Sequence, residues 1–187
     1  MSSGTVAQLL AEWRDYFSVV GTIAATFLGL LFVSVSLNAE TILADGNIHL
    51  KQLAEQAYQS YVIVVLGSVL FLFPSLDLPT YVIVFGALGA SGLAWFSYRL
   101  FHIMRISDAH YSWIFRLRRV VPGAVAYVLM IVAAWGVWTL PNRVSPGTSL
   151  GLLGIATVML LISATASSWD LLVKVAQTRK SQRPPAP

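Results

Sequence analysis

The sequence contains no cysteine among its 187 residues, and charged residues make up only 11% of it. The absence of cysteine excludes disulfides, thiolate metal sites, iron–sulfur clusters and a cysteine nucleophile. Soluble domains carry about 25% charged residues, so this composition argues against a water-soluble, nucleic-acid-binding or disordered protein. The sequence also lacks the GxSxG, P-loop, GxGxxG and HExxH motifs. We therefore expect no catalytic residues, no metal and no cofactor.

Hydrophobic residues, in contrast, make up 57% of the chain. They gather in five apolar segments, and each reaches the ~20 residues that a bilayer-spanning helix requires. Turn-forming residues punctuate the segments, including Pro74 and Pro79, which bracket the turn between the second and third, and Pro122-Gly123 at the start of the fourth. The sequence thus predicts an all-α integral membrane helical bundle with five transmembrane helices, at residues 16–37, 57–76, 80–100, 120–140 and 148–169.

Lysine and arginine are distributed unevenly between the two sides of these spans. One side holds only Arg14 and Arg143, and the other holds the remaining ten basic residues. The positive-inside rule then places the N-terminus outside and the C-terminus in the cytoplasm of a bacterial inner membrane. Residues 1–15 are expected to form an interfacial helix before the membrane domain of residues 16–176. The basic, proline-rich residues 177–187 are expected to be a disordered tail.

Basic and aromatic residues mix near the cytoplasmic end of the third span and in the loop that follows. Such a stretch is typical of a surface that binds anionic lipid or a protein partner. The alternative is that the arginines only enforce the topology. The candidate lipid- or partner-binding residues are Arg99, His102, Arg105, Trp113, Arg116, Arg118 and Arg119.

Polar residues also end the first and fifth spans at matching depth, which predicts a polar cytoplasmic cluster of Ser36, Asn38, Glu40, Ser163, Ser167 and Asp170. Small residues recur every three or four positions in three spans, and such spacing lets helices approach closely. These predicted helix-packing residues are Ser18, Thr22, Ala25, Gly29, Gly86, Ala90, Ala94, Gly147 and Gly151.

Two short motifs carry a resemblance to a known family. They are residues 29–38, which follow Trp13-Arg14-Asp15-Tyr16-Phe17, and residues 168–173 of the last span. Both resemble small, uncharacterised multi-span bacterial integral membrane proteins, of which some are labelled "modulator of FtsH protease". The resemblance implies a non-enzymatic membrane partner of a membrane-bound AAA protease.

The leading hypothesis is a non-catalytic, multi-pass interaction protein whose basic cytoplasmic face meets anionic lipid or a membrane protein partner. The alternative is a homo-oligomeric channel or small-solute transporter, with Ser18, Thr22 and Ser36 lining its path. A more distant alternative is a lipid-modifying enzyme that uses Arg99, His102 and Asp170.

Overall fold

The computed structural model describes residues 3–44, 47–73, 78–106, 113–139 and 146–181, and every regular element in these residues is a helix. The prediction of an all-α fold is confirmed for this part of the chain. The elements are α1 (Ser3–Leu37), α2 (Ala39–Leu43), α3 (Ile48–Leu72), α4 (Leu78–Ile106), α5 (Trp113–Thr139) and α6 (Pro146–Ser181).

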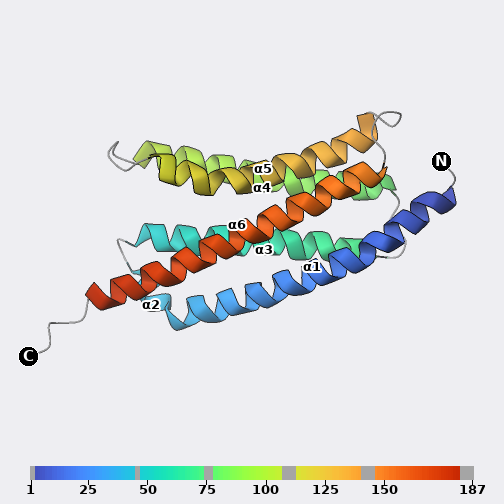
Figure 1. Ribbon diagram of the computed structural model, residues 1–187. Coiled ribbons are helices and arrows are strands. Elements are labelled where there is room, and N and C mark those ends of the chain that lie inside the picture. The colour runs from blue at the N-terminus through green and yellow to red at the C-terminus, as the bar shows by residue number, and fades with distance from the viewer. Residues whose placement is uncertain (1–2, 45–46, 74–77, 107–112, 140–145, 182–187) are drawn as a thin grey trace, which may run out of the picture.

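The five long helices run up and down in one bundle (Figure 1). Successive long helices point in opposite directions, so α1 begins and α6 ends at opposite ends of the bundle. Helix α6 packs against α1, α3 and α5, whereas α4 packs mainly against α5 and more lightly against α3. The short α2 packs on α3 and α6 near the end of the bundle where α1 finishes.

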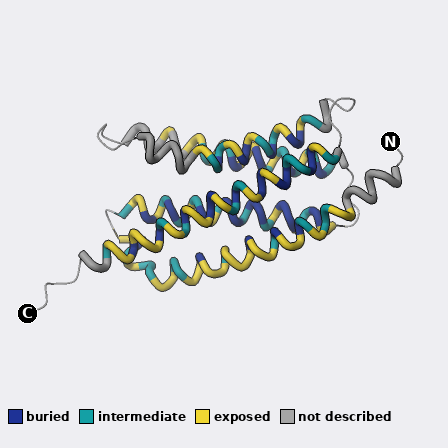
Figure 2. Tube along the Cα trace, viewed as in Figure 1, coloured by how far each residue is buried: buried dark blue, intermediate teal, exposed yellow. Residues whose placement is uncertain are grey.

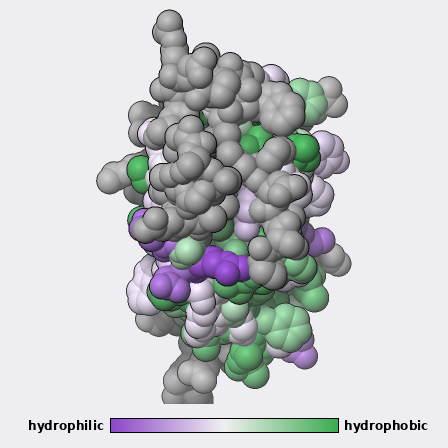
Figure 3. Space-filling view, turned by 90° about the vertical axis from the view of Figure 1, so that its right-hand side faces the viewer, coloured by the Kyte–Doolittle hydropathy of each residue, from purple (hydrophilic) through white to green (hydrophobic). Residues whose placement is uncertain are grey.

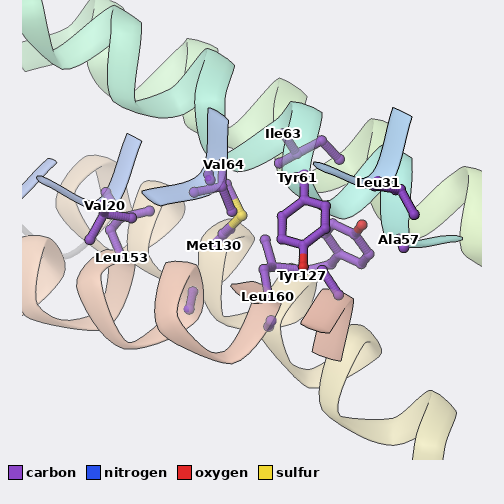
Figure 4. Packing of buried hydrophobic residues seen from close by; sticks show 14 of the residues in the cluster. Val20, Leu31, Ala57, Tyr61, Ile63, Val64, Tyr127, Met130, Leu153 and Leu160 are labelled. Carbon is purple, nitrogen blue, oxygen red and sulfur yellow. The ribbon is translucent and has the colours of Figure 1, made fainter. Parts of the chain in front are cut away.

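The buried side chains follow the central helices (Figure 2). In the apolar 18-residue stretch of α6, 50% of the residues are buried, whereas in that of α1 only 17% are. Val20, Val64, Met130 and Leu153 meet at the centre of the bundle, where side chains from α1, α3, α5 and α6 interdigitate (Figure 4). Large apolar side chains on the outside stay exposed, among them Leu30, Phe32, Ile83, Ile155 and Ile162. This apolar exterior is what a lipid-facing surface requires.

Four helical stretches in the described residues are long and apolar enough to cross a membrane, by length and composition. They are Ala11–Leu37, Ile48–Leu72, Thr80–Tyr98 and Gly147–Thr178. The predicted span at residues 120–140 falls in α5, where the apolar stretch that the structure describes, Val121–Gly136, is shorter. Four of the five predicted spans therefore have a counterpart that is long enough to cross.

The second span begins earlier and ends earlier than the predicted range of residues 57–76. Helix α3 is continuous from Ile48 to Leu72. The next residue, Phe73, is extended, with φ −67° and ψ 122°. A residue before proline is driven out of the helical region, and Pro74 follows Phe73 in the sequence. The prediction that residues 73–76 continue this helix is wrong for Phe73, and residues 74–76 lie outside the described part.

The termini of other helices also differ from the predicted boundaries. No break separates residues 3–15 from the first span, because α1 is one helix of 35 residues. Pro122 does not open its span, since α5 begins at Trp113 and carries the proline inside it. Helix α6 continues to Ser181, so residues 177–181 of the predicted disordered tail are helical and residues 182–187 lie outside the described part.

Candidate functional site: the basic end and the hydroxyl cluster

The topology brings the basic segments of the chain to one end of the bundle. We call it the basic end: α1, α4 and α6 finish there, and α3 and α5 begin there (Figure 1). Lys51 lies in the first turn of α3, and Lys174 lies near the end of α6. Both side chains are exposed. The remaining basic residues in the described helices of this end are Arg99, Arg105, Arg116, Arg118, Arg119, Arg179 and Lys180.

The predicted lipid- or partner-binding residues all fall in the two helices that form one hairpin at this end. Arg99, His102 and Arg105 belong to the last turns of α4, whereas Trp113, Arg116, Arg118 and Arg119 belong to the first turns of α5. Their side chains lie outside the part that the structure describes. Helices α4 and α5 pack against each other, and the last turns of α4 lie at the same end of the bundle as the first turns of α5 (Figure 1).

The predicted polar cytoplasmic cluster does not form one surface. On α1 and α2, Ser36 and Glu40 are exposed, and the Asn38 side chain donates a hydrogen bond of 2.7 Å to the Ser34 carbonyl. On α6, Ser163 and Ser167 are buried and Asp170 is half-buried. The α6 serines therefore belong to the interior of the bundle, not to a surface shared with α1.

Two hydroxyl contacts join α3 to its neighbours, and the sequence did not predict them. The hydroxyl of Tyr127 on α5 is hydrogen-bonded to Ser60 on α3. One residue further along α3, the Tyr61 hydroxyl lies 3.2 Å from the Thr165 hydroxyl on α6. We call these four residues, Ser60, Tyr61, Tyr127 and Thr165, the hydroxyl cluster.

The predicted helix-packing residues divide between inward and outward positions. Gly86 faces α5, where an added Cβ would lie 3.5 Å from Ala134. Ser18, Thr22 and Ala25 are exposed on α1, and an added Cβ on Gly29 would meet nothing within 4 Å. The others also leave room: Ala90 and Ala94 are exposed, Gly147 is half-buried, and an added Cβ on Gly151 meets nothing within 4 Å.

Other glycines make the close helix contacts. Added Cβ atoms would lie 2.6 Å from Ser68 at Gly21, 3.0 Å from Phe85 at Gly67 and 2.8 Å from Trp13 at Gly154. On α4, Gly89 and Gly92 face α5, and a Cβ on Gly92 would overlap the Tyr127 ring. Small residues do make the close helix contacts, but mostly not the ones that the spacing predicted. Apolar residues surround every helix in such a chain, so the sequence did not show which face points inward.

The opposite end of the bundle, which we call the aromatic end, is closed by rings. Phe17 of α1 stacks on Phe71 of α3 with ring centroids 3.8 Å apart, and Phe85 of α4 lies 5.1 Å from Phe71. Tyr16 donates a 2.8 Å hydrogen bond to the Gly154 carbonyl of α6. Viewed onto this end, hydrophilic residues form a patch in the middle of the described surface, and hydrophobic residues lie below it and to its right (Figure 3).

Two polar side chains hold the end of α3 at the aromatic end. The last carbonyls of a helix have no partner within it. Arg14 of α1 donates a 3.2 Å hydrogen bond to the Leu72 carbonyl, and Tyr81 of α4 donates one of 3.4 Å to the Phe73 carbonyl. A guanidinium is also favoured at a helix C-terminus by the helix dipole. Arg14 is therefore explained by the fold, unlike the basic residues at the other end.

Within the described residues, no group of three or more histidine, aspartate or glutamate side chains lies close enough together to hold a metal ion. Comparison with protein-family models, curated proteins and solved structures finds no match to this chain. The class of protein therefore follows from the fold itself. Long apolar helices with an apolar exterior indicate a membrane protein.

Proposed function

We propose that the protein is a non-catalytic, multi-pass membrane protein whose basic end binds anionic lipid or a membrane protein partner. It crosses a bacterial inner membrane five times, with its N-terminus outside and its C-terminus in the cytoplasm. The observation that carries the proposal is the gathering of nine basic residues of the described helices at one end, against Arg14 at the other.

The fifth crossing is supported by the direction and length of α5. Its 27 residues extend about 40 Å at 1.5 Å per residue, which exceeds the ~30 Å of a bilayer core. Helix α5 also lies alongside α4 and α6. An odd number of crossings puts the start of α1 and the end of α6 on opposite sides, as the up-and-down order of the helices requires.

The position of three arginines on α5 favours an interaction with molecules outside the bundle, such as anionic lipid. Arg116, Arg118 and Arg119 lie in its first two turns, at the positive end of the helix dipole. Arginine gains nothing from its own helix there. Anionic lipid at the membrane surface contributes about 1 kcal/mol for each basic residue close to it. Three neighbouring arginines would together contribute about 3 kcal/mol of attraction to anionic lipid.

Charge reversal of these three arginines tests the proposal. We expect the solubilised variant R116E/R118E/R119E to lose roughly 100-fold in affinity for phosphatidylglycerol supplied in mixed micelles, because about 3 kcal/mol of attraction is removed. Arg143→Glu, which changes one charge in the sequence of the opposite loop, is the control and should bind as the unaltered protein does. Unchanged affinity of the triple variant for phosphatidylglycerol would contradict lipid binding.

The protein partner is tested by the mass of the assembly after gentle extraction from its own membranes. The family resemblance implies a membrane-bound AAA protease as that partner. A heavier assembly that contains such a protease, and that the triple arginine variant no longer forms, is the expected result. A monomer carrying only anionic lipid would contradict the protease partner and leave lipid as the ligand.

An oligomeric channel is the second candidate, and the exposed polar face of α1 favours it. Ser18, Thr22 and Ser36 are all exposed on this helix. They can line a path only between copies of the chain. In liposomes, Thr22→Trp should then reduce solute flux, and flux no greater than that of empty vesicles would contradict this function.

A further inference from the structure

Large aromatic side chains from four helices face outward in the half of the bundle nearer the basic end. They are Phe32 of α1, Tyr58 of α3, Trp95 of α4 and Trp169 of α6, and each is more than half exposed. We call these four residues the exposed belt. Their levels along the bundle can be compared, because each helix contacts α3 at a known residue and rises 1.5 Å per residue from there.

The belt residue of α1 lies level with the belt residue of α3. Gly21 of α1 lies against Ser68 of α3, and the two helices run in opposite directions (Figure 1). Eleven residues further along α1, the belt residue is therefore opposite Ala57 of α3, which is next to Tyr58.

The belt residues of α4 and α6 lie at the same level. Both helices also run opposite to α3 (Figure 1). The Phe85 ring of α4 lies against Gly67 of α3, and the belt residue follows ten positions later. The Thr165 hydroxyl of α6 lies 3.2 Å from the Tyr61 hydroxyl of α3, and the belt residue follows four positions later. Each count again leads to Ala57, so four helices present an aromatic ring at one level.

The chemistry of the helices changes at the belt. From the belt to the level of Phe73 at the aromatic end, the described helices contain no lysine, arginine, aspartate or glutamate. On the other side of the belt, Glu40, Lys51, Glu55 and Lys174 are exposed. Tryptophan and tyrosine are enriched where the hydrocarbon core of a membrane meets its headgroups. The belt therefore has the composition of a membrane boundary.

The length of α6 agrees with a boundary at this level. Its apolar stretch begins at Gly147, and Trp169 follows about 33 Å further along the helix at 1.5 Å per residue. The hydrocarbon core of a bilayer is about 30 Å thick. Helix α6 then continues to Ser181 for about 18 Å, and α3 begins at Ile48, about 15 Å beyond Tyr58 on the same side.

The part of the bundle beyond the belt has buried apolar residues of its own. Ile42 of α2, Leu50 and Leu53 of α3, and Leu171 and Val175 of α6 are all buried. Helix α2 packs on both α3 and α6. These three segments thus bury apolar side chains against one another, and they need no lipid to cover them.

We propose that the exposed belt binds the headgroup boundary of one bilayer leaflet, and that α2, the turns of α3 before Tyr58 and the turns of α6 after Trp169 form a water-exposed layer outside the bilayer. This inference goes beyond the proposed function, which concerns what the basic residues bind. It holds whichever side of the membrane the basic end faces. The alternative is immersion of the whole apolar helix Ile48–Leu72.

The absence of cysteine from the chain makes the test direct, because a single introduced thiol is the only one present. Val173→Cys and its control Ile162→Cys are treated with a charged methanethiosulfonate reagent in phosphatidylcholine nanodiscs, whose two faces are both open to the reagent. Both native side chains are exposed and apolar. They share the outward face of α6 with Trp169, Ile162 two turns before it and Val173 one turn after it.

We expect the thiol at position 173 to react about tenfold faster or more than the thiol at position 162, because a charged reagent does not enter hydrocarbon. In denaturing detergent the two should react at the same rate, which excludes a difference in intrinsic reactivity. Equal rates for the two folded variants would overturn the proposal.

A second pair on α3 repeats the comparison in case an α6 variant aggregates. Ile48 and Leu66 are exposed on opposite sides of the belt level. Ile48→Cys should react about tenfold faster or more than Leu66→Cys, for the same reason. A folded Ile48→Cys protein that reacts no faster than Leu66→Cys would mean that α3 is immersed over its whole length, which overturns the proposal equally.

Discussion

The two ends of the bundle use the same kinds of residue in opposite ways. At the aromatic end, Phe17 of α1 stacks on Phe71 of α3, Phe85 of α4 packs against both rings at a tilt, and all three are almost completely buried. At the basic end, large rings point outward: Trp95 is 51% exposed, Tyr98 66% and Trp169 67%. Aromatic rings with a polar group prefer the headgroup level of a membrane. The aromatic end thus has a buried ring cluster that joins three helices, besides the exposed rings of Phe73 and Trp135, whereas the rings of Trp95, Tyr98 and Trp169 at the basic end are all exposed.

Glycine accounts for part of this difference. Gly67 and Gly154 at the aromatic end leave space for Phe85 and Trp13, with added Cβ atoms 3.0 and 2.8 Å from those rings. A large flat ring against a glycine brings two helices close together. Trp95, Tyr98 and Trp169 are more than half exposed and have no such place in the interior. Burial of a ring in this bundle therefore depends on what faces it.

Removing a ring from each end gives the largest expected contrast. Phe71→Ala should lower the free energy of unfolding by about 3–5 kcal/mol, because it empties the middle of the stacked cluster. Trp169→Ala removes a larger ring from an exposed site and should cost less than about 1 kcal/mol. Unfolding in mixed micelles with increasing denaturing detergent measures both. Equal losses would contradict the division of roles between the ends.

A pair of glycine substitutions sharpens the same point with smaller effects. A Cβ on Gly92 would overlap the Tyr127 ring, so Gly92→Ala should destabilise the protein by about 1–3 kcal/mol. A Cβ on Gly29 meets nothing within 4 Å, and alanine favours a helix over glycine by up to about 1 kcal/mol. Gly29→Ala should therefore be neutral or stabilising in the same unfolding measurement. Destabilisation by Gly29→Ala would instead mean that another molecule covers this face of α1.

The sequence predicts the helices of this protein better than it predicts their inward faces. Long apolar runs and the prolines between them are strong local signals, and they placed four helices that can cross a membrane. Gly86 was predicted as a packing residue, but the glycines with the closest contacts, such as Gly21 and Gly92, were not, because small residues on α1 and α4 occur on outward as well as inward sides. The hydroxyl cluster was not predicted. The contacts of Tyr61 with Thr165 and of Tyr127 with Ser60 depend on how α3 lies against α6 and α5, which no spacing in the sequence encodes.

The smallest contrast concerns the polar contacts at the two ends. Arg14 donates a hydrogen bond to a helix-terminal carbonyl, and its positive charge also meets the helix dipole. Arg14→Ala should therefore cost about 1 kcal/mol and lower the melting temperature in detergent by roughly 2–4 °C.

At the basic end, the exposed Lys51 ammonium lies 4.0 Å from the Glu55 carboxylate one turn along α3. A pair of this kind is worth about 0.3–0.5 kcal/mol, so Lys51→Ala should shift the melting temperature by about 1 °C or less. Arg14→Lys separates the two contributions at the aromatic end, since lysine keeps the charge but not the planar donor group. An intermediate loss for Arg14→Lys would assign part of the stability to the hydrogen bond itself. If the Arg14→Ala protein melts at no lower a temperature than the Lys51→Ala protein, packing of the rings alone holds the aromatic end together. The fold would then not explain Arg14, just as it does not explain the basic residues at the other end.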